Sequence, residues 1–208
     1  MEQQRNETRT LLRSVVLLVI LQAVREGIGR LVLPYLPPDL FWNRMLTMWV
    51  MTILTVPVLL IAQNEDLLFR FFPKRFTRGY AVATAVTALL YITAPANFTG
   101  GFRAVALLLY GSIVTPAFEE LLFRSLLWER CTRAGMPERR VFGWNVALFT
   151  LWHLGYMLPA VAAGNWAAVL TKLAAGFGYG VVLGLVRRKT GSVYACFLVH
   201  GVLNLFMI

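Results

Sequence analysis

The segment AVALLLYGSIVTPAFEELLFRSLLWER, residues 104–130, decides the fold of this chain. It is apolar over most of its length, yet Glu119, Glu120 and Arg124 lie in its interior. A run of about 20 apolar residues crosses a hydrocarbon core about 30 Å thick. Ionisable groups inside such a run are costly, and each raises the expectation of a functional site. The segment therefore predicts a membrane span with chemistry inside it.

The composition of the whole chain agrees with this interpretation. Of its 208 residues, 58% are hydrophobic and only 14% are charged, far from the usual balance of a soluble domain. We expect an all-α, polytopic transmembrane helix bundle in which residues 1–208 form a single integral-membrane domain. About seven spans are predicted: Leu11 to Leu33, Leu40 to Ala62, Tyr80 to Ala96, Ala104 to Arg130, Phe142 to Val161, Trp166 to Val186 and Val193 to Ile208.

The first of these spans has the weakest pattern. Its apolar run ends at Ala23 and is followed by Arg25, Glu26 and Arg30, so we expect it to lie partly in the interface. A cleaved signal peptide is a poor alternative, because no A-x-A-like site follows and further spans do.

Lysine and arginine positions predict the orientation, because positively charged loops stay on the cytoplasmic side. Basic residues precede the first span and follow the second, fourth and sixth: Arg5, Arg9, Arg13, Arg70, Lys74, Arg75, Arg78, Arg130, Arg133, Arg139, Arg140, Arg187, Arg188 and Lys189. The other connections are poorer in charge, apart from Arg25, Arg30 and Arg44. We therefore expect a cytoplasmic N-terminus and an outside C-terminus in an integral membrane protein. The short length of the chain is the separate reason to expect a prokaryotic inner membrane.

The formal net charge of +10 does not indicate nucleic-acid binding. The basic residues are spread over successive loops rather than gathered into one patch with aromatic residues. Contact with the lipid bilayer and its anionic headgroups explains them better. The two cysteines, Cys131 and Cys196, are assigned no role.

Four polar side chains on three spans are expected at one depth. From the cytoplasmic ends of their spans, Glu119 and His153 each lie about 16 Å along the helix, at about 1.5 Å per residue. His200 and Asn204 come out at about 10 and 16 Å by the same rise. This shared layer predicts that the four side chains form one site.

Helical spacing divides their roles. Glu120 and Arg124 are four residues apart and oppositely charged, which favours an intrahelical ion pair. Glu119 is rotated about 100° away and is the freer carboxylate. Two further pairs, Phe149 with His153 and His200 with Asn204, have the same spacing of four.

These residues resemble the motifs of the CPBP family, which includes type II CAAX prenyl endopeptidases. Glu119-Glu120 with Arg124 is similar to EExxxR, Phe149 with His153 to FxxxH, and His200 with Asn204 to HxxxN. The resemblance covers roughly Ala104 to Ile208, so residues 104–208 are expected to be the motif-bearing catalytic half.

The resemblance implies an intramembrane endopeptidase of the glutamic type. Glu119 would be the general base and, with His153, would hold and deprotonate the attacking water. The oxyanion hole would come from His200 and Asn204. Glu120 and Arg124 would orient Glu119, and Phe149 would limit where the His153 imidazole can go. The implied substrate is a membrane-associated peptide or protein, with or without a lipid, cut in a C-terminal tail or anchoring segment. Access is expected through a cavity that opens toward the cytoplasmic side.

Two alternatives stay open at this stage. One Glu and two His can bind catalytic zinc, so Glu119, His153 and His200 could instead be metal ligands, although an H-E-x-x-H arrangement is missing. We expect no metal and no other cofactor. The second alternative is a non-catalytic membrane protein, such as an immunity protein, that binds a peptide in the same cavity.

Overall fold

The computed structural model describes residues 1–66 and 71–206, and this part of the chain is helical with no strand. Its first half contains α1 (Glu2–Val32), η1 (Leu33–Tyr35), α2 (Leu40–Asn64), α3 (Arg78–Ile92), α4 (Ala96–Thr99) and α5 (Gly101–Leu109). The second half contains η3 (Tyr110–Val114), α6 (Thr115–Glu120), η4 (Leu121–Leu127), α7 (Trp128–Arg133), α8 (Glu138–Trp152), η5 (His153–Met157), α9 (Leu158–Ala162), α10 (Trp166–Thr190) and α11 (Val193–Leu205). The all-α prediction is confirmed.

Within the described residues, five helical stretches are long and apolar enough to cross a membrane. They are Leu40–Asn64, Arg78–Thr99, Gly101–Arg133, Glu138–Ala162 and Trp166–Thr190. Each contains or overlaps one of the predicted spans.

The first and last predicted spans differ from these five. The first falls within α1, a 31-residue helix that is not among them, and its Arg25, Glu26 and Arg30 explain why. The last corresponds to α11, which is apolar but only 13 residues long. Residues 207–208 of that span lie outside the described part of the chain.

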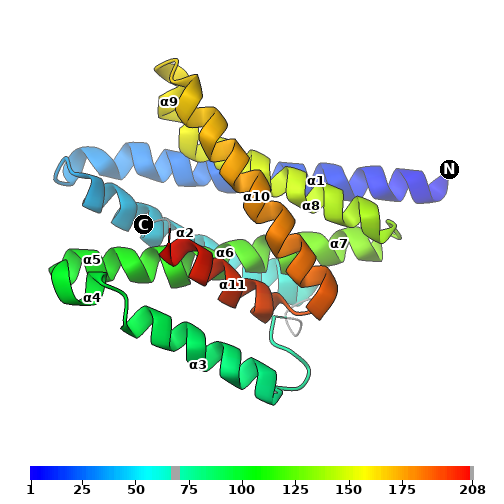
Figure 1. Cartoon of the computed structure of the whole chain (residues 1–208). Helices are drawn as coiled ribbons and strands as arrows, with labels where there is room; N and C mark the ends of the chain where they lie inside the picture. The colour runs from blue at the N-terminus through cyan, green and yellow to red at the C-terminus, as the bar shows by residue number, and fades with distance from the viewer. Residues whose placement is uncertain (67–70, 207–208) are drawn as a thin grey trace.

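Helix ends follow from local sequence. Asp39 and Ser192 begin α2 and α11 by accepting hydrogen bonds from the backbone N–H groups of Trp42 and Ala195, as N-cap residues do. Gly191 ends α10 with φ of 64°, a left-handed conformation that favours glycine. The sharp turn between α10 and α11 brings α11 back against the bundle (Figure 1).

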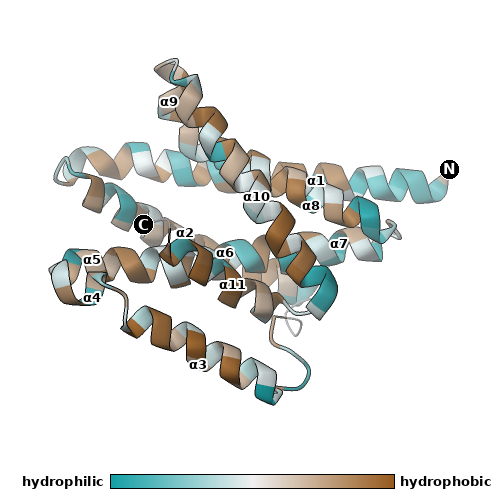
Figure 2. Ribbon diagram, viewed as in Figure 1, coloured by the Kyte–Doolittle hydropathy of each residue, from teal (hydrophilic) through white to brown (hydrophobic). Residues whose placement is uncertain are grey.

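The segment from α5 to α7 runs through the centre of the molecule (Figure 1). Four of its side chains, Leu122, Phe123, Leu126 and Leu127, are at most 1% exposed. They pack with α2, α8 and α11 in one hydrophobic core. By contrast, α3 lies at the edge, and Figure 2 shows hydrophobic residues along it. In the apolar part of Arg78–Thr99, the stretch that begins with α3, only 11% of the residues are buried. This is expected for a helix that faces lipid.

Helices α8 and α10 cross closely because α10 carries glycines. A Cβ added at Gly180 would lie 3.3 Å from a Val146 methyl carbon, and one at Gly184 would lie 2.7 Å from the Phe142 ring. An added Cβ at Gly178 would meet nothing within 4 Å. The packing face therefore has small residues four positions apart, at Gly180 and Gly184, in agreement with a small-xxx-small pattern.

Candidate active site

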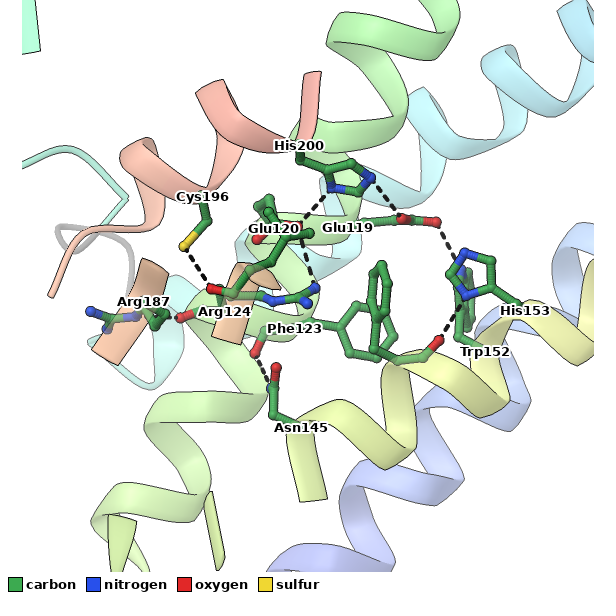
Figure 3. Close-up of polar contacts among 12 residues, drawn as sticks. Glu119, Glu120, Phe123, Arg124, Asn145, Trp152, His153, Arg187, Cys196 and His200 are labelled. Atoms are coloured by element: carbon green, nitrogen blue, oxygen red, sulfur yellow. Dashed lines mark hydrogen bonds and ion pairs between the residues drawn. The ribbon is translucent and has the colours of Figure 1, made fainter. Parts of the chain in front are cut away.

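Three spans bring acidic and imidazole side chains together in the interior (Figure 3). Glu119 and Glu120 end α6, His153 follows α8 at the start of η5, and His200 lies in α11. All four side chains are buried, with His153 the most exposed at 9%. Three of them, Glu119, His153 and His200, belong to the layer predicted from depths along the spans, and they line one cavity with Asn204.

The helix that carries the two carboxylates is irregular on both sides of them. π-helical turns extend over Tyr110–Val114 and Leu121–Leu127, and such turns are frequent at functional sites. Pro116 lies between them and has no backbone N–H, so carbonyls in the preceding turn lose a helical donor.

Side chains from other spans replace the missing donors. Tyr91 Oη donates to the Ser112 carbonyl at 2.9 Å, and Asn204 Nδ2 donates to the Gly111 carbonyl at 2.7 Å. Asn204 therefore ties α11 to the helix that carries Glu119. Its amide has a second N–H, and the residue also lines the cavity described below.

The second π-helical turn is stabilised in the same way. Asn145 Nδ2 donates to the Phe123 carbonyl at 2.6 Å, and Arg187 Nε donates to the Arg124 carbonyl at 3.0 Å. Two polar side chains from α8 and α10 thus hold the backbone directly after Glu120 in place.

Glu119 is held through one of its two carboxylate oxygens. Trp152 Nε1 and Tyr156 Oη donate to Oε1 at 3.2 and 3.4 Å. The indole also donates to the Tyr156 hydroxyl at 3.0 Å, so these three groups form a closed triangle. The second oxygen, Oε2, lies 3.8 Å from His200 Nε2. One oxygen is therefore anchored, while the other faces the second histidine.

The His153 ring is oriented by its own helix. Its Nδ1 lies 2.8 Å from the Phe149 carbonyl, which can only accept, so Nδ1 carries the proton. In the neutral ring, Nε2 then has a free lone pair. This nitrogen is suited to accept a hydrogen bond from a water molecule or a substrate group.

Glu120 links His200 to Arg124. His200 Nδ1 lies 2.8 Å from Glu120 Oε1, and Arg124 Nη1 lies 3.3 Å from the same oxygen. Both partners of the ion pair are 0% exposed, and the predicted pairing of Glu120 with Arg124 is confirmed. Because the carboxylate accepts at Nδ1, His200 must be doubly protonated before its Nε2 can also donate.

Phe149 is packed among the charged and imidazole groups. Its ring lies 4.1 Å from the Arg124 guanidinium carbon and contacts His153 edge-on, with ring centroids 4.9 Å apart. A second edge-on contact, at 6.0 Å, is with His200. The ring thus restricts both imidazoles, as the sequence predicts for His153.

A cavity of about 400 Å³ is lined by all four residues predicted to be catalytic, a volume within the range of ligand sites. Its wall includes Glu119, His153, His200 and Asn204, together with the basic side chains of Arg44 and Lys172. Cavity, carboxylate and imidazoles therefore meet at one place.

The cavity lies in the half of the bundle that contains the start of α2 and the end of α11. The N-terminus and the ends of α7 and α10 lie toward the opposite end (Figure 1). These are the basic segments expected in the cytoplasm. The cavity and the N-terminus, both predicted on the cytoplasmic side, thus lie toward opposite ends of the bundle, and both placements stay predictions.

Over residues 1–66 and 71–206, no group of three or more His, Cys, Asp or Glu residues is arranged to hold a metal ion. Glu119 Oε2 and His200 Nε2 are 3.8 Å apart, and the bond from His153 Nδ1 to the Phe149 carbonyl leaves His153 Nε2 free. The zinc ligand set considered above therefore stays an alternative, which chelation tests in solution.

Sequence reasoning missed the two donors to Glu119. Trp152 and Tyr156 are spaced four apart at the end of an apolar span, with polar atoms at their tips, and such tips usually find a partner when buried. That spacing was the available signal. The close approach of Gly176 to His153, 3.1 Å from an added Cβ to Nδ1, was also missed.

Comparisons with known proteins agree with these motifs. The family model described as type II CAAX prenyl endopeptidase Rce1-like matches residues 101–206. No curated protein and no solved structure matches the chain. The match covers half of the chain and contains every motif described above, and on this ground the chain belongs to the Rce1-like family of type II CAAX prenyl endopeptidases, within the CPBP proteases.

Proposed function

We propose that this protein is a glutamate-dependent intramembrane endopeptidase. One observation carries the proposal: Glu119, fixed through one oxygen by Trp152 and Tyr156, lines the same cavity as His153. Family membership supports peptidase activity in general. We propose in addition which residues perform the reaction. We also propose that residues 1–208 act as one membrane domain.

In this mechanism, Glu119 and His153 Nε2 hold one water molecule. Glu119 takes a proton from the water as the oxygen bonds to the scissile carbonyl carbon. The same proton then passes to the leaving amine nitrogen as the carbon–nitrogen bond breaks. No proton is lost or gained over the cycle.

The negative charge on the carbonyl oxygen is stabilised by donors on α11. His200 Nε2 would donate to this oxygen from a doubly protonated ring whose Nδ1 bonds to Glu120. The second N–H of Asn204 adds to this oxyanion hole. Removing one such donor typically lowers the rate on the order of 100-fold.

The substrate is a peptide or protein segment held at the membrane. Two probes test this, namely internally quenched peptides that end in cysteine, two aliphatic residues and a variable residue, one farnesylated and one unmodified. We expect the purified protein in detergent to cleave at least one of them. Unequal rates for the pair show whether a prenyl group is recognised.

Variants and a chelator test the chemistry in the same assay. We expect Glu119→Gln to abolish cleavage, whereas Glu138→Gln, an exposed carboxylate outside the cavity, keeps it. Activity should survive EDTA. Loss with EDTA and recovery with zinc would instead make Glu119, His153 and His200 metal ligands. Binding of the peptides without any cleavage would favour the non-catalytic alternative.

A further inference from the structure

Helix α1 contacts the candidate active site although it lies outside the residues matched by the family model. The helix is held against the bundle by buried side chains, among them Leu18 and Leu21. The next turn presents Gln22 and Arg25 to η5, the turn that carries His153. Arg25 is a charged side chain that is only 10% exposed.

Gln22 and Arg25 act on the backbone of this turn. Gln22 Nε2 donates to the Trp152 carbonyl at 2.7 Å, and Arg25 Nη2 donates to the Gly155 carbonyl at 2.7 Å. Arg25 Nε also donates to Gln22 Oε1 at 2.7 Å, so the two side chains form one unit. Carbonyls at a helix C-terminus lack helical donors, and a cation there interacts favourably with the helix dipole.

The same guanidinium extends toward the catalytic carboxylate. Its carbon lies 4.6 Å from the centre of the Tyr156 ring, a cation–π geometry. The Tyr156 hydroxyl and the Trp152 indole are the two donors to Glu119. Arg25 thus contacts the ring of Tyr156, and Gln22 bonds to the carbonyl of Trp152. Both residues that hold Glu119 are therefore contacted from α1.

The approach of α1 to this turn requires a glycine. A Cβ added at Gly155 would collide with the side-chain amide of Gln22. Because Gly155 lacks a side chain, Gln22 reaches the Trp152 carbonyl and Arg25 reaches the Gly155 carbonyl. The contact therefore depends on residues from both partners, α1 and η5.

We infer that Gln22 and Arg25 are positioning residues for the general base, and that α1 is part of the catalytic apparatus rather than only a membrane anchor. They fix η5, which fixes Trp152, Tyr156 and His153, and these set the position of the Glu119 carboxylate. This inference rests on the proposed function. A misplacement of about 1 Å at a reacting group can cost on the order of 100-fold in rate.

The test measures kcat and KM for a peptide that the wild-type protein cleaves. We expect Arg25→Met to lower kcat at least roughly tenfold, with KM changed by less than about threefold, because the base moves while the cavity wall stays. Arg25→Lys should recover part of the loss, since it keeps the charge but not the planar fork. The matched control is Arg30→Met, on the same helix and 75% exposed, which should behave as wild type.

Two milder variants keep the test valid if Arg25→Met does not fold. Gln22→Ala and Gly155→Ala should lower kcat in the same way, whereas Gly143→Ala, where an added Cβ meets nothing within 4 Å, should not. Equal kcat for Gln22→Ala, Gly155→Ala and the controls would overturn the inference. If Glu119→Gln retained full activity, the proposed function itself would fail, so the two failures are distinguishable.

Discussion

The buried ion pair between Glu120 and Arg124 yields a prediction for stability. Both side chains are 0% exposed, with Nη1 and Oε1 3.3 Å apart. Glu120 Oε2 and Arg124 Nε and Nη2 have no hydrogen-bond partner in the described part of the chain. Arg124→Met would leave the Glu120 carboxylate buried without its guanidinium, which typically costs about 3–5 kcal/mol.

A second variant separates structure from catalysis at this pair. Glu120→Gln/Arg124→Met removes both charges of this pair, so its free energy of unfolding should return to within about 1 kcal/mol of wild type. Its cleavage rate should stay low, because His200 Nδ1 no longer has a carboxylate acceptor to orient the ring. Unfolding in detergent by dodecyl sulfate titration gives the stabilities, and peptide cleavage gives the activities. A double variant as unstable as Arg124→Met would refute the reasoning, and so would a fully active one.

Three further predictions follow from other contacts. Gly176→Ala places a Cβ against His153 Nδ1, the atom that bonds to the Phe149 carbonyl. The rate of peptide cleavage should therefore fall roughly tenfold or more. The control Gly178→Ala, in open space, should leave the rate unchanged, and equal effects of the two variants would contradict this. The hydrogen bond from the Trp42 backbone N–H, together with Arg103, lowers the pKa of Asp39 from its ordinary 3.8, so Asp39 stabilises the fold above that value and this stabilisation is lost as pH falls through the lowered pKa. Between about pH 5 and pH 2, the melting temperature should therefore fall further for wild type than for Asp39→Asn, which keeps a capping side chain. Parallel curves would contradict this. The loop charges favour a cavity on the side of the membrane opposite the basic segments. On intact cells, a membrane-impermeant maleimide should therefore label Thr99→Cys and not Arg139→Cys. The reverse labelling would place the cavity on the cytoplasmic side.

Local spacing in the sequence was enough to predict several contacts. The Glu120–Arg124 pair follows from two charges four residues apart on one helix. The gathering of Glu119, His153 and His200 follows from counting residues along antiparallel spans. Each of these predictions depends only on spacing or depth counted along a single helical segment, which the sequence gives directly.

Other features depend on irregular backbone or on contacts between distant segments. The π-helical turns beside Pro116 change which carbonyls lack a donor, so sequence alone did not reveal that Asn204 would bond to Gly111. Contacts of Gln22 and Arg25 with η5 join residues about 130 positions apart. The side on which the cavity opens stays a prediction, as does the orientation that the loop charges favour.

The most direct test of the central claim, that Glu119 activates water rather than attacking the substrate itself, is a single turnover in water enriched in oxygen-18. Excess enzyme is mixed with one cleaved peptide, and mass spectrometry measures the new product carboxylate and the enzyme fragment that contains Glu119. The account predicts one oxygen-18 atom in the product carboxylate and none in Glu119. Ordinary oxygen in the product with oxygen-18 in Glu119 would contradict it, because the carboxylate itself would then have attacked.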